Sequence, residues 1–306
     1  MALMTMFHAI LVPLDGSRLA EQAISAAAGI ARRAGAALHF AMVHEPPPAR
    51  LLTSEPPRVV EELDQEARMW SAEYLETAAT AVRTTHGLPV TTACLNGQPA
   101  TVLAEYIRGR KVDLTVMTTH GTGGLNRWWL GSVADRLLRR TSVPVLLLHP
   151  RDLPQPTEFH RILVALDGEI EGPVLEPALA LGSLGSGACY LLTRVVAPAA
   201  PILSPLAAYP TRHRPDWAKR QEIAARNYLA RLSSRLQGGG FVVRTEVVVA
   251  RAIAEAVLDA ARSHAADLIA VGTHGASGAE RLILGSVADK VLRTATQPVL
   301  VAPAPD

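Results

Sequence analysis

The sequence has few aromatic side chains, almost no cysteine and no long hydrophobic run. Aromatic residues make up 4% of the 306 residues although hydrophobic residues make up 49%, so the cores must be built from Val, Leu, Ile and Ala. This composition suits parallel sheets that are covered by helices on both faces. Cys94 and Cys189 lack any metal or redox spacing, which predicts reduced thiols and a cytoplasmic location. Without an apolar run of about 18 residues or a signal-peptide pattern, we expect no membrane contact.

The sequence also lacks a charge excess and the motifs of several enzyme classes. With 30 basic and 28 acidic residues the formal charge is +2, which gives no electrostatic footprint for nucleic acid. There is no Walker lysine loop, kinase signature or Gly-x-Ser-x-Gly elbow. A Ser-Gly-Gly-x-Asp loop and a His-x-Gly-His pair, which adenylate-forming enzymes use, are also missing. We therefore predict no catalytic residue.

What the sequence does contain is an internal repeat. The segment ILVPLDGS (10–17) recurs as ILVALDGE (162–169). The longer segment THGTGGLNRWWLGSVADRLLRR, which begins at residue 119, recurs as THGASGAERLILGSVADKVLRT, which begins at residue 273. A repeat over whole halves indicates duplication of one domain of about 150 residues. The stretch between the copies is rich in proline and polar residues, which is typical of a linker. The predicted first domain is 1–150, the linker is 151–159 and the second domain is 160–306.

Within each half, patterns of strand and helix alternate. An aliphatic run at 8–14 predicts a strand, an alanine-rich stretch at 17–35 predicts a helix, and the alternation continues to a last strand at 143–149. Five strands separated by four helices predict an α/β fold with a parallel, doubly wound, Rossmann-like sheet in each half. Arg32 and Arg33 are expected to be a solvated helix end. The second helix is predicted from residues spaced three and four apart: Leu63, Ala67, Trp70, Tyr74, Ala78 and Val82.

In a sheet of this kind, ligands lie beyond the carboxyl ends of the strands where the strand order reverses. After strand four, the second half reads Gly272-Thr-His-Gly275, then nine residues, then Gly285-Ser286 at the start of a helix. Glycines let backbone N–H groups approach an anion, and a helix start attracts phosphate. Asp15 and Asp167 follow strand one and could accept from a ribose hydroxyl or an adenine edge, or could simply cap the next helix.

The spacing Gly-x-x-Gly, nine residues, Gly-Ser resembles the nucleotide motif of the universal stress protein family, whose domain is a five-stranded α/β unit. The resemblance spans nearly the whole chain twice, and the motif elements occur in the family order. It implies an adenine-nucleotide site in each half, and from their matching places Arg127 and Arg281 could reach phosphate oxygens. His120 and His274 are interpreted as structural turn residues or as donors of a hydrogen bond to phosphate. The site residues it implies in the first half are Asp15, Val43, Met117, His120, Gly121, Arg127, Gly131, Ser132 and Val133. Those in the second half are Asp167, Val195, Val271, Gly272, His274, Gly275, Arg281, Gly285, Ser286 and Val287.

Both halves depart from the motif, and the second half also has Arg251-Ala-Ile where the first has Gly97-Gln-Pro99. Thr118 stands where the second half has Gly272, and a β-branched side chain there would crowd a ligand. Glu169 stands where the first half has Ser17, and a carboxylate beside a triphosphate repels it unless Mg²⁺ or an arginine intervenes. Binding by one half or by both is left open. No partnering His, Cys or carboxylate lies at ligand spacing from His120 or His274, so no protein metal site is predicted.

The resemblance implies an ATP-binding sensor or effector of the stress response, with ATP, ADP or AMP as ligand, with or without Mg²⁺. Two alternatives stay open: a slow ATP-hydrolysing enzyme, and an interaction protein of the same fold that binds no nucleotide. Family dimers imply an antiparallel contact between the last strands, 143–149 and 297–303, as a pseudo-dimer or in a homo-oligomer. A protein partner is expected but not identified. The proline-rich stretches 45–57 and 197–215 are interpreted as lids over the adenine or as plain connectors.

Overall fold

The computed structural model describes residues 7–46, 56–119, 130–150, 154–168, 172–198, 215–273 and 284–303. The glycine-rich segments 120–129 and 274–283, and most of both proline-rich stretches, lie outside the described residues. Among the described residues no helix is long and apolar enough to cross a membrane.

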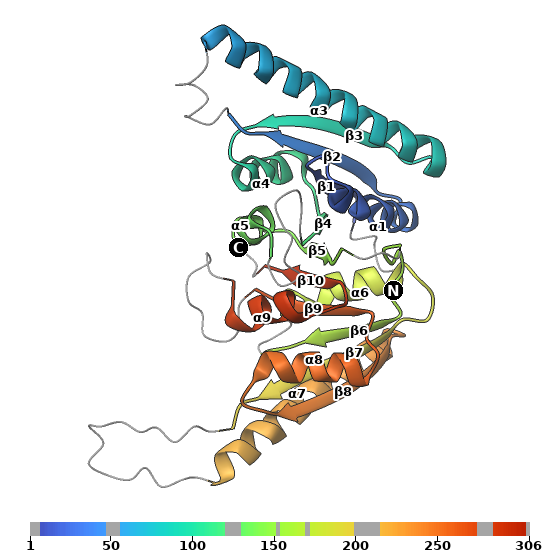
Figure 1. The fold of residues 1–306 in the computed structure, drawn as a ribbon. Coiled ribbons are helices and arrows are strands. Elements are labelled where there is room, and N and C mark those ends of the chain that lie inside the picture. Colours follow the sequence, from blue (N-terminus) through green and yellow to red (C-terminus); the bar gives the residue numbers. More distant parts are fainter. Residues whose placement is uncertain are drawn as a thin grey trace, which may run out of the picture.

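Each half alternates strands and helices as predicted (Figure 1). The elements of the first half are β1 (Ala9–Leu14), α1 (Arg18–Ala34), β2 (Ala37–His44), α3 (Pro57–His86), β3 (Val90–Asn96), α4 (Pro99–Arg110), β4 (Leu114–Thr118), α5 (Ser132–Leu138) and β5 (Val145–Leu148). Those of the second half are β6 (Arg161–Ala165), α6 (Leu175–Ser183), β7 (Cys189–Val196), α7 (Pro215–Gly238), β8 (Val242–Val249), α8 (Ile253–Ser263), β9 (Leu268–Gly272), α9 (Ser286–Thr294) and β10 (Val299–Ala302).

The strands of both halves join one sheet of ten, in the order β3-β2-β1-β4-β5-β10-β9-β6-β7-β8. Within each half the neighbouring strands are parallel, and the halves meet where β10 pairs with β5 in the antiparallel sense, with Val299 opposite Leu147. This confirms the predicted contact between the last strands. The pairing also covers two strand edges that would otherwise be open to other chains.

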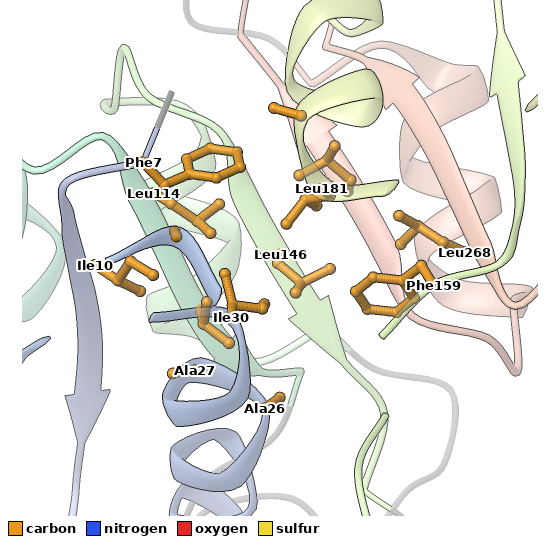
Figure 2. Packing of buried hydrophobic residues seen from close by; sticks show 14 of the residues in the cluster. Phe7, Ile10, Ala26, Ala27, Ile30, Leu114, Leu146, Phe159, Leu181 and Leu268 are labelled. Carbon is orange, nitrogen blue, oxygen red and sulfur yellow. The ribbon is translucent and has the colours of Figure 1, made fainter. Parts of the chain in front are cut away.

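The core lies in two layers, one on each face of the sheet. One cluster joins residues of β1 and β6 to α1, α3, α6 and α7, and the other joins alternate residues of the same strands to α4, α5, α8 and α9. Figure 2 shows that the first layer is continuous across the seam, since Ile30 of α1, Leu146 of β5 and Leu181 of α6 face the same space. Aliphatic side chains fill most of both layers, as the composition predicts.

The helix α3 is present, but the predicted apolar stripe on it is partly wrong. Leu63 and Trp70 are 47% and 51% exposed, whereas the buried apolar side chains are Val60, Leu75, Ala79 and Val82. With 30 residues, α3 is far longer than the strands it covers, so part of it runs beyond the edge of the sheet (Figure 1). A stripe read along the whole helix therefore mixes a core face with a solvent face.

The segment before β6 packs against α1. The side chain of Gln155 donates to Gln22 of α1 at 3.0 Å, and Phe159 is buried in the shared core. Arg33 donates to the carbonyl of Thr157 at 2.9 Å and forms an ion pair with Glu158. The expectation that Arg33 is solvated is therefore wrong, because a helix end that is exposed in an isolated domain is covered here by the approach to the second half.

Candidate functional site

The turn after β1 is built around Asp15, Gly16 and Ser17. Ser17 caps α1, since its hydroxyl accepts from the N–H of Ala20 at 3.1 Å. One carboxylate oxygen of Asp15 accepts from the N–H of Ser17 at 3.0 Å. The alternative in which Asp15 is the helix cap is thus not what this structure has, because Ser17 does that work. Asp15 stands one step further out, at the end of the strand.

Asp15 also stands at the point where the strand order reverses. From β1 the chain proceeds to β2 and β3 on one side, and then crosses to β4 on the other side. Because β1 pairs with β4 in parallel, with Ile10 opposite Leu114, the carboxyl ends of these two strands are neighbours. In the second half β6 pairs with β9 in the same way, which brings Asp167 beside the end of β9. Such a reversal is where open α/β sheets hold their ligands.

The two ends of each glycine-rich segment are tied together at this place. The N–H of Gly131 donates to the carbonyl of Thr119 at 2.7 Å, and the N–H of Gly285 donates to that of Thr273 at 2.6 Å. Both threonines are buried, and each follows the end of its strand. Each segment of the motif therefore leaves and rejoins the fold at one point, next to Asp15 or Asp167.

The helices that follow these glycines begin without a side-chain cap, in contrast to α1. Gly131 before α5 and Gly285 before α9 occupy the cap positions, and neither can supply a side-chain oxygen. The first N–H groups of α9, from Ser286 onward, thus have no side-chain acceptor at the cap position. Unpaired N–H groups at the start of a helix favour a bound anion.

The predicted apolar site residues fall on one face of the sheet, together with α4 and α5 in the first half and α8 and α9 in the second. Met117 and Val271 are buried within that core layer, and the other members are partly buried and pack against it. The predicted residues on this face are Val43, Met117, Val133, Val195, Val271 and Val287. The six predicted residues His120, Gly121, Arg127, His274, Gly275 and Arg281 lie outside the described residues.

A feature that the sequence did not predict covers the glycine after each aspartate. Gly16 has a φ of 78°, and a Cβ placed on it would collide with the indole of Trp70. Trp70 stacks on Tyr74, with ring centroids 5.4 Å apart and planes at 13°. The hydroxyl of Tyr74 donates to Glu21 at 3.0 Å. Burial, and then this bond to a carboxylate, holds the pKa of Tyr74 well above its ordinary value.

In the second half a cation takes the place of the indole. Gly168 has a φ of 91°, and a Cβ on it would collide with the guanidinium of Arg194. The same guanidinium lies 5.7 Å from the centre of the Tyr228 ring. Burial, followed by the carboxylate of Asp167, raises the pKa of Tyr228, and Arg194 acts in the opposite direction. The charge near Asp167 therefore differs from that near Asp15.

A pocket of about 360 Å³ opens beside the first site, at the ends of β2 and β3. His44 contacts Asp64 at 2.5 Å, and Arg68 donates to Asp64 at 2.7 Å and to Asn96 at 2.6 Å. The hydrogen bond from Arg68, and then that from His44, lowers the pKa of Asp64. His44 is paired with Asn96 in the sheet, whereas the corresponding pair in the second half is Val196 with Val249. This polar network thus belongs to the first half.

Comparison with known proteins gives one consistent result. The model of the universal stress protein family matches residues 6–149 and again residues 158–303. A universal stress protein of Mycobacterium tuberculosis is 29% identical over 240 residues, which cover 78% of this chain and 77% of that protein. One from Methanocaldococcus jannaschii is 31% identical over 144 residues, or 47% of this chain and 82% of that protein.

Among solved structures, a universal stress protein from Archaeoglobus fulgidus covers 97% of both chains with a TM-score of 0.67 at 20% sequence identity. At that identity the likeness establishes the fold, and it does so over both halves at once. The family match and the fold agree with the repeat found in the sequence. The chain belongs to the universal stress protein family, with the family pattern present in each half.

Proposed function

We propose that each half binds an adenine nucleotide across the ends of its first and fourth strands, and that the chain acts as a nucleotide-binding sensor or effector of the stress response. The observation that carries this proposal is the closure of each glycine-rich segment by one short backbone bond, Gly131 to Thr119 and Gly285 to Thr273. In the first half the closure lies beside Asp15, which does not cap its helix. In the second half it lies beside Asp167, the residue that matches Asp15.

The groups around each closure have the chemistry that a nucleotide requires. The carboxylate of Asp15 or Asp167 can accept a hydrogen bond from a ribose hydroxyl, and the valines and Met117 offer an apolar wall to a base. Backbone N–H groups of the glycine-rich motif and of the first turn of α9 can bind phosphate oxygens. These residues fit ATP, ADP and AMP; Mg²⁺ would arrive with the di- or triphosphate.

The two halves differ at the last residue of the fourth strand. Thr118 is buried at the end of β4, while Gly272 at the end of β9 presents no side chain. We expect the second half to bind more tightly at this point of contact. Among the described residues of the site no nucleophile is paired with a base, and the sequence shows no motif of a hydrolase, so binding is proposed here in preference to ATP hydrolysis.

The first experiment identifies what the protein carries. Gently purified protein is denatured, and the released small molecules are identified and counted by mass spectrometry; one or two equivalents of adenine nucleotide per chain are expected. Calorimetry with added ATP and Mg²⁺ then gives the number of sites. A protein that carries no nucleotide and takes up no ATP would favour the alternative hypothesis, an interaction protein of the same fold that binds no nucleotide.

Two sets of variants locate the site. Asp15→Ala with Asp167→Ala should weaken binding at least tenfold, about 1.4 kcal/mol, whereas the matched change Asp259→Ala on the exposed surface of α8 should leave it unchanged. Gly275→Val should remove one site and Gly121→Val the other. Equal affinity of parent and aspartate variant would mean that the carboxylates only shape their turns. Multiple-turnover phosphate release that is lost in these variants would favour the enzyme.

The proposal includes a cytoplasmic setting and further assembly. Cys94 and Cys189 are free thiols in the structure, which suits a reducing compartment. The outer strands β3 and β8 end the sheet, so association of two chains and contact with a protein partner have edges available. Light scattering of the purified protein, with and without ATP, gives the oligomeric state.

A further inference from the structure

The side chains that cover Gly16 and Gly168 differ because the residues at two positions differ together between the halves. Trp70 lies four residues before Tyr74, and the residue four before Tyr228 is Ala224. On the strand, Leu14 is paired with Met42, and the same register in the second half leads to Arg194. The first half therefore combines a methionine with an indole, and the second half combines an arginine with an alanine.

The tyrosine is the element that the two covers share. In the first half Tyr74 supports the indole by stacking, and in the second half Tyr228 supports the guanidinium through its ring face. In each case the supported group lies against the glycine that directly follows the aspartate of the site. One architecture thus holds either a neutral ring or a fixed cation at the same place.

We propose that this exchange sets the ligand charge that each half prefers: Arg194 makes the second half favour ligands with more phosphate groups, and Trp70 leaves the first half with a weaker preference. The inference rests on the proposed nucleotide function. A guanidinium keeps its charge at any physiological pH, and its attraction for an anion near a protein surface grows with the charge of that anion.

The placement of Arg194 supports an effect on the ligand without a catalytic role. Tyr190 and Leu192, at alternate positions on β7 before Arg194, belong to the core layer under α6 and α7, whereas Val195 packs in the layer under α8 and α9. Arg194 and Val195 therefore approach the end of β6 from opposite faces. Arg194 would flank the ligand and act on it through its charge, which makes it a specificity-determining residue.

Arg194 also offers a cation near the acidic residue that distinguishes the sequence of the second half. In the sequence Glu169 stands at the position of Ser17 in the first half, and a triphosphate is repelled by a carboxylate unless a cation intervenes. Arg194 contacts Gly168, the residue directly before Glu169 in the chain. The second half, which carries the extra acid in its sequence, is also the half that carries the extra cation.

The test compares ligands that differ only in charge. Adenosine, AMP, ADP and ATP are titrated without Mg²⁺ into two variants, Gly121→Val to report on the second half and Gly275→Val to report on the first. The ratio of ATP to adenosine affinity should be larger in the second half. Adding Arg194→Met, which introduces the residue that the first half has, should lower ATP affinity roughly fivefold and leave adenosine unchanged.

Two further variants separate charge from packing. Arg194→Lys should retain most of the preference for ATP, because the charge remains. The double variant Met42→Arg with Trp70→Ala, in the chain that reports on the first half, should raise its ATP to adenosine ratio, because it transfers the second-half cover. Raised salt should reduce the ratio in each chain that carries the cation. Circular dichroism checks that every variant is folded.

The outcomes are distinct. If Arg194→Met lowers the affinity for all four ligands equally, the residue acts by packing and the inference is wrong. It is equally wrong if the two halves give the same series, or if the Gly121→Val chain binds nothing while the parent binds nucleotide. If the parent chain itself binds none of the four ligands, it is the proposed nucleotide function that fails.

Discussion

Gly29 lies in the middle of α1, at the place where the segment before β6 crosses this helix. A Cβ built on Gly29 would stand 2.5 Å from Cβ of Thr157 and 2.7 Å from its Cγ2. Real Cβ atoms do not approach other carbons so closely, so one of the two backbones would have to move. The backbone of Thr157 is held by Arg33, which donates to its carbonyl at 2.9 Å and to the carbonyl of Gly29 at 2.8 Å.

Two opposing effects decide the outcome of Gly29→Ala. Replacing a glycine inside a helix by alanine stabilises that helix by about 1 kcal/mol. Forcing an extra methyl into a packed contact costs about 1 to 3 kcal/mol. Because the neighbour here is a β-branched residue on a held backbone, we expect the second effect to win, with a net loss of up to about 2 kcal/mol.

The chain offers a matched control in Gly109, near the end of α4. A Cβ on Gly109 meets nothing within 4 Å, so Gly109→Ala should stabilise the protein by up to about 1 kcal/mol. The free energy of unfolding is measured by urea titration with circular dichroism. In a Thr157→Gly background, Gly29→Ala should lose its cost and become neutral or stabilising. A Gly29→Ala variant as stable as Gly109→Ala would refute the close packing of this segment on α1.

Two further predictions concern ionisable groups. The hydrogen bonds from Arg68 and His44 hold the pKa of Asp64 below its ordinary value of 3.8. The stabilising contribution of Asp64 is therefore present above that pH and is lost as the pH falls through the lowered pKa. Asp64→Asn should flatten the acid side of a plot of Tm against pH, and an unchanged acid side would contradict the network. Burial is the largest cause that raises the pKa of four tyrosines above 10, so their contribution is present below pH 10 and is lost as the pH rises through the raised pKa. In an absorbance titration these side chains should stay protonated near pH 10 in the folded protein and ionise there in urea; ionisation near pH 10 in both would show that they are solvated. The four are Tyr74, Tyr106, Tyr190 and Tyr228.

The fold could be predicted because each local pattern agreed with the others. The repeat located two domains, and the alternation of aliphatic runs with alanine-rich stretches determined the order of strands and helices. The helix predicted at 17–35 is present as α1, and Gly35, which ends it, has a positive φ of 69°. The exposure of Leu63 and the burial of Arg33 could not be predicted, since both depend on how far an element extends beyond its neighbour or which distant segment covers it.

For the site, the sequence predicted the aspartates and the glycine spacing, since these follow strand ends in one linear order. It did not predict the covers, although all four residues were visible. Trp70 and Tyr74 were two members of a predicted helical stripe, and Arg194 and Tyr228 were given no role. Trp70 of α3 meets Gly16, and Arg194 of β7 meets Gly168, through tertiary packing and strand pairing that no local pattern specifies.

The position of each element in the ten-stranded sheet explains which residues agree between the halves. LGSVAD is identical in both copies, and it lies at the seam, where its members Leu130, Ala134, Leu284 and Ala288 are buried in the layer that both halves share.

The aspartates of LGSVAD are constrained at the seam as well. Asp135 bonds Arg139 at 3.0 Å, and the pKa of Arg139 is raised first by that bond and also by Asp289 of the other half. In the same way, the pKa of Arg293 is raised first by its hydrogen bond to Asp289 and also by Asp135 of the other half. A change in this motif would disturb both halves at once. The covers lie away from the seam, on β2, α3, β7 and α7, where each half packs by itself. Duplication has therefore left LGSVAD at the seam alike in both halves and the flank beside the aspartate free to differ, which is where Trp70 and Arg194 stand.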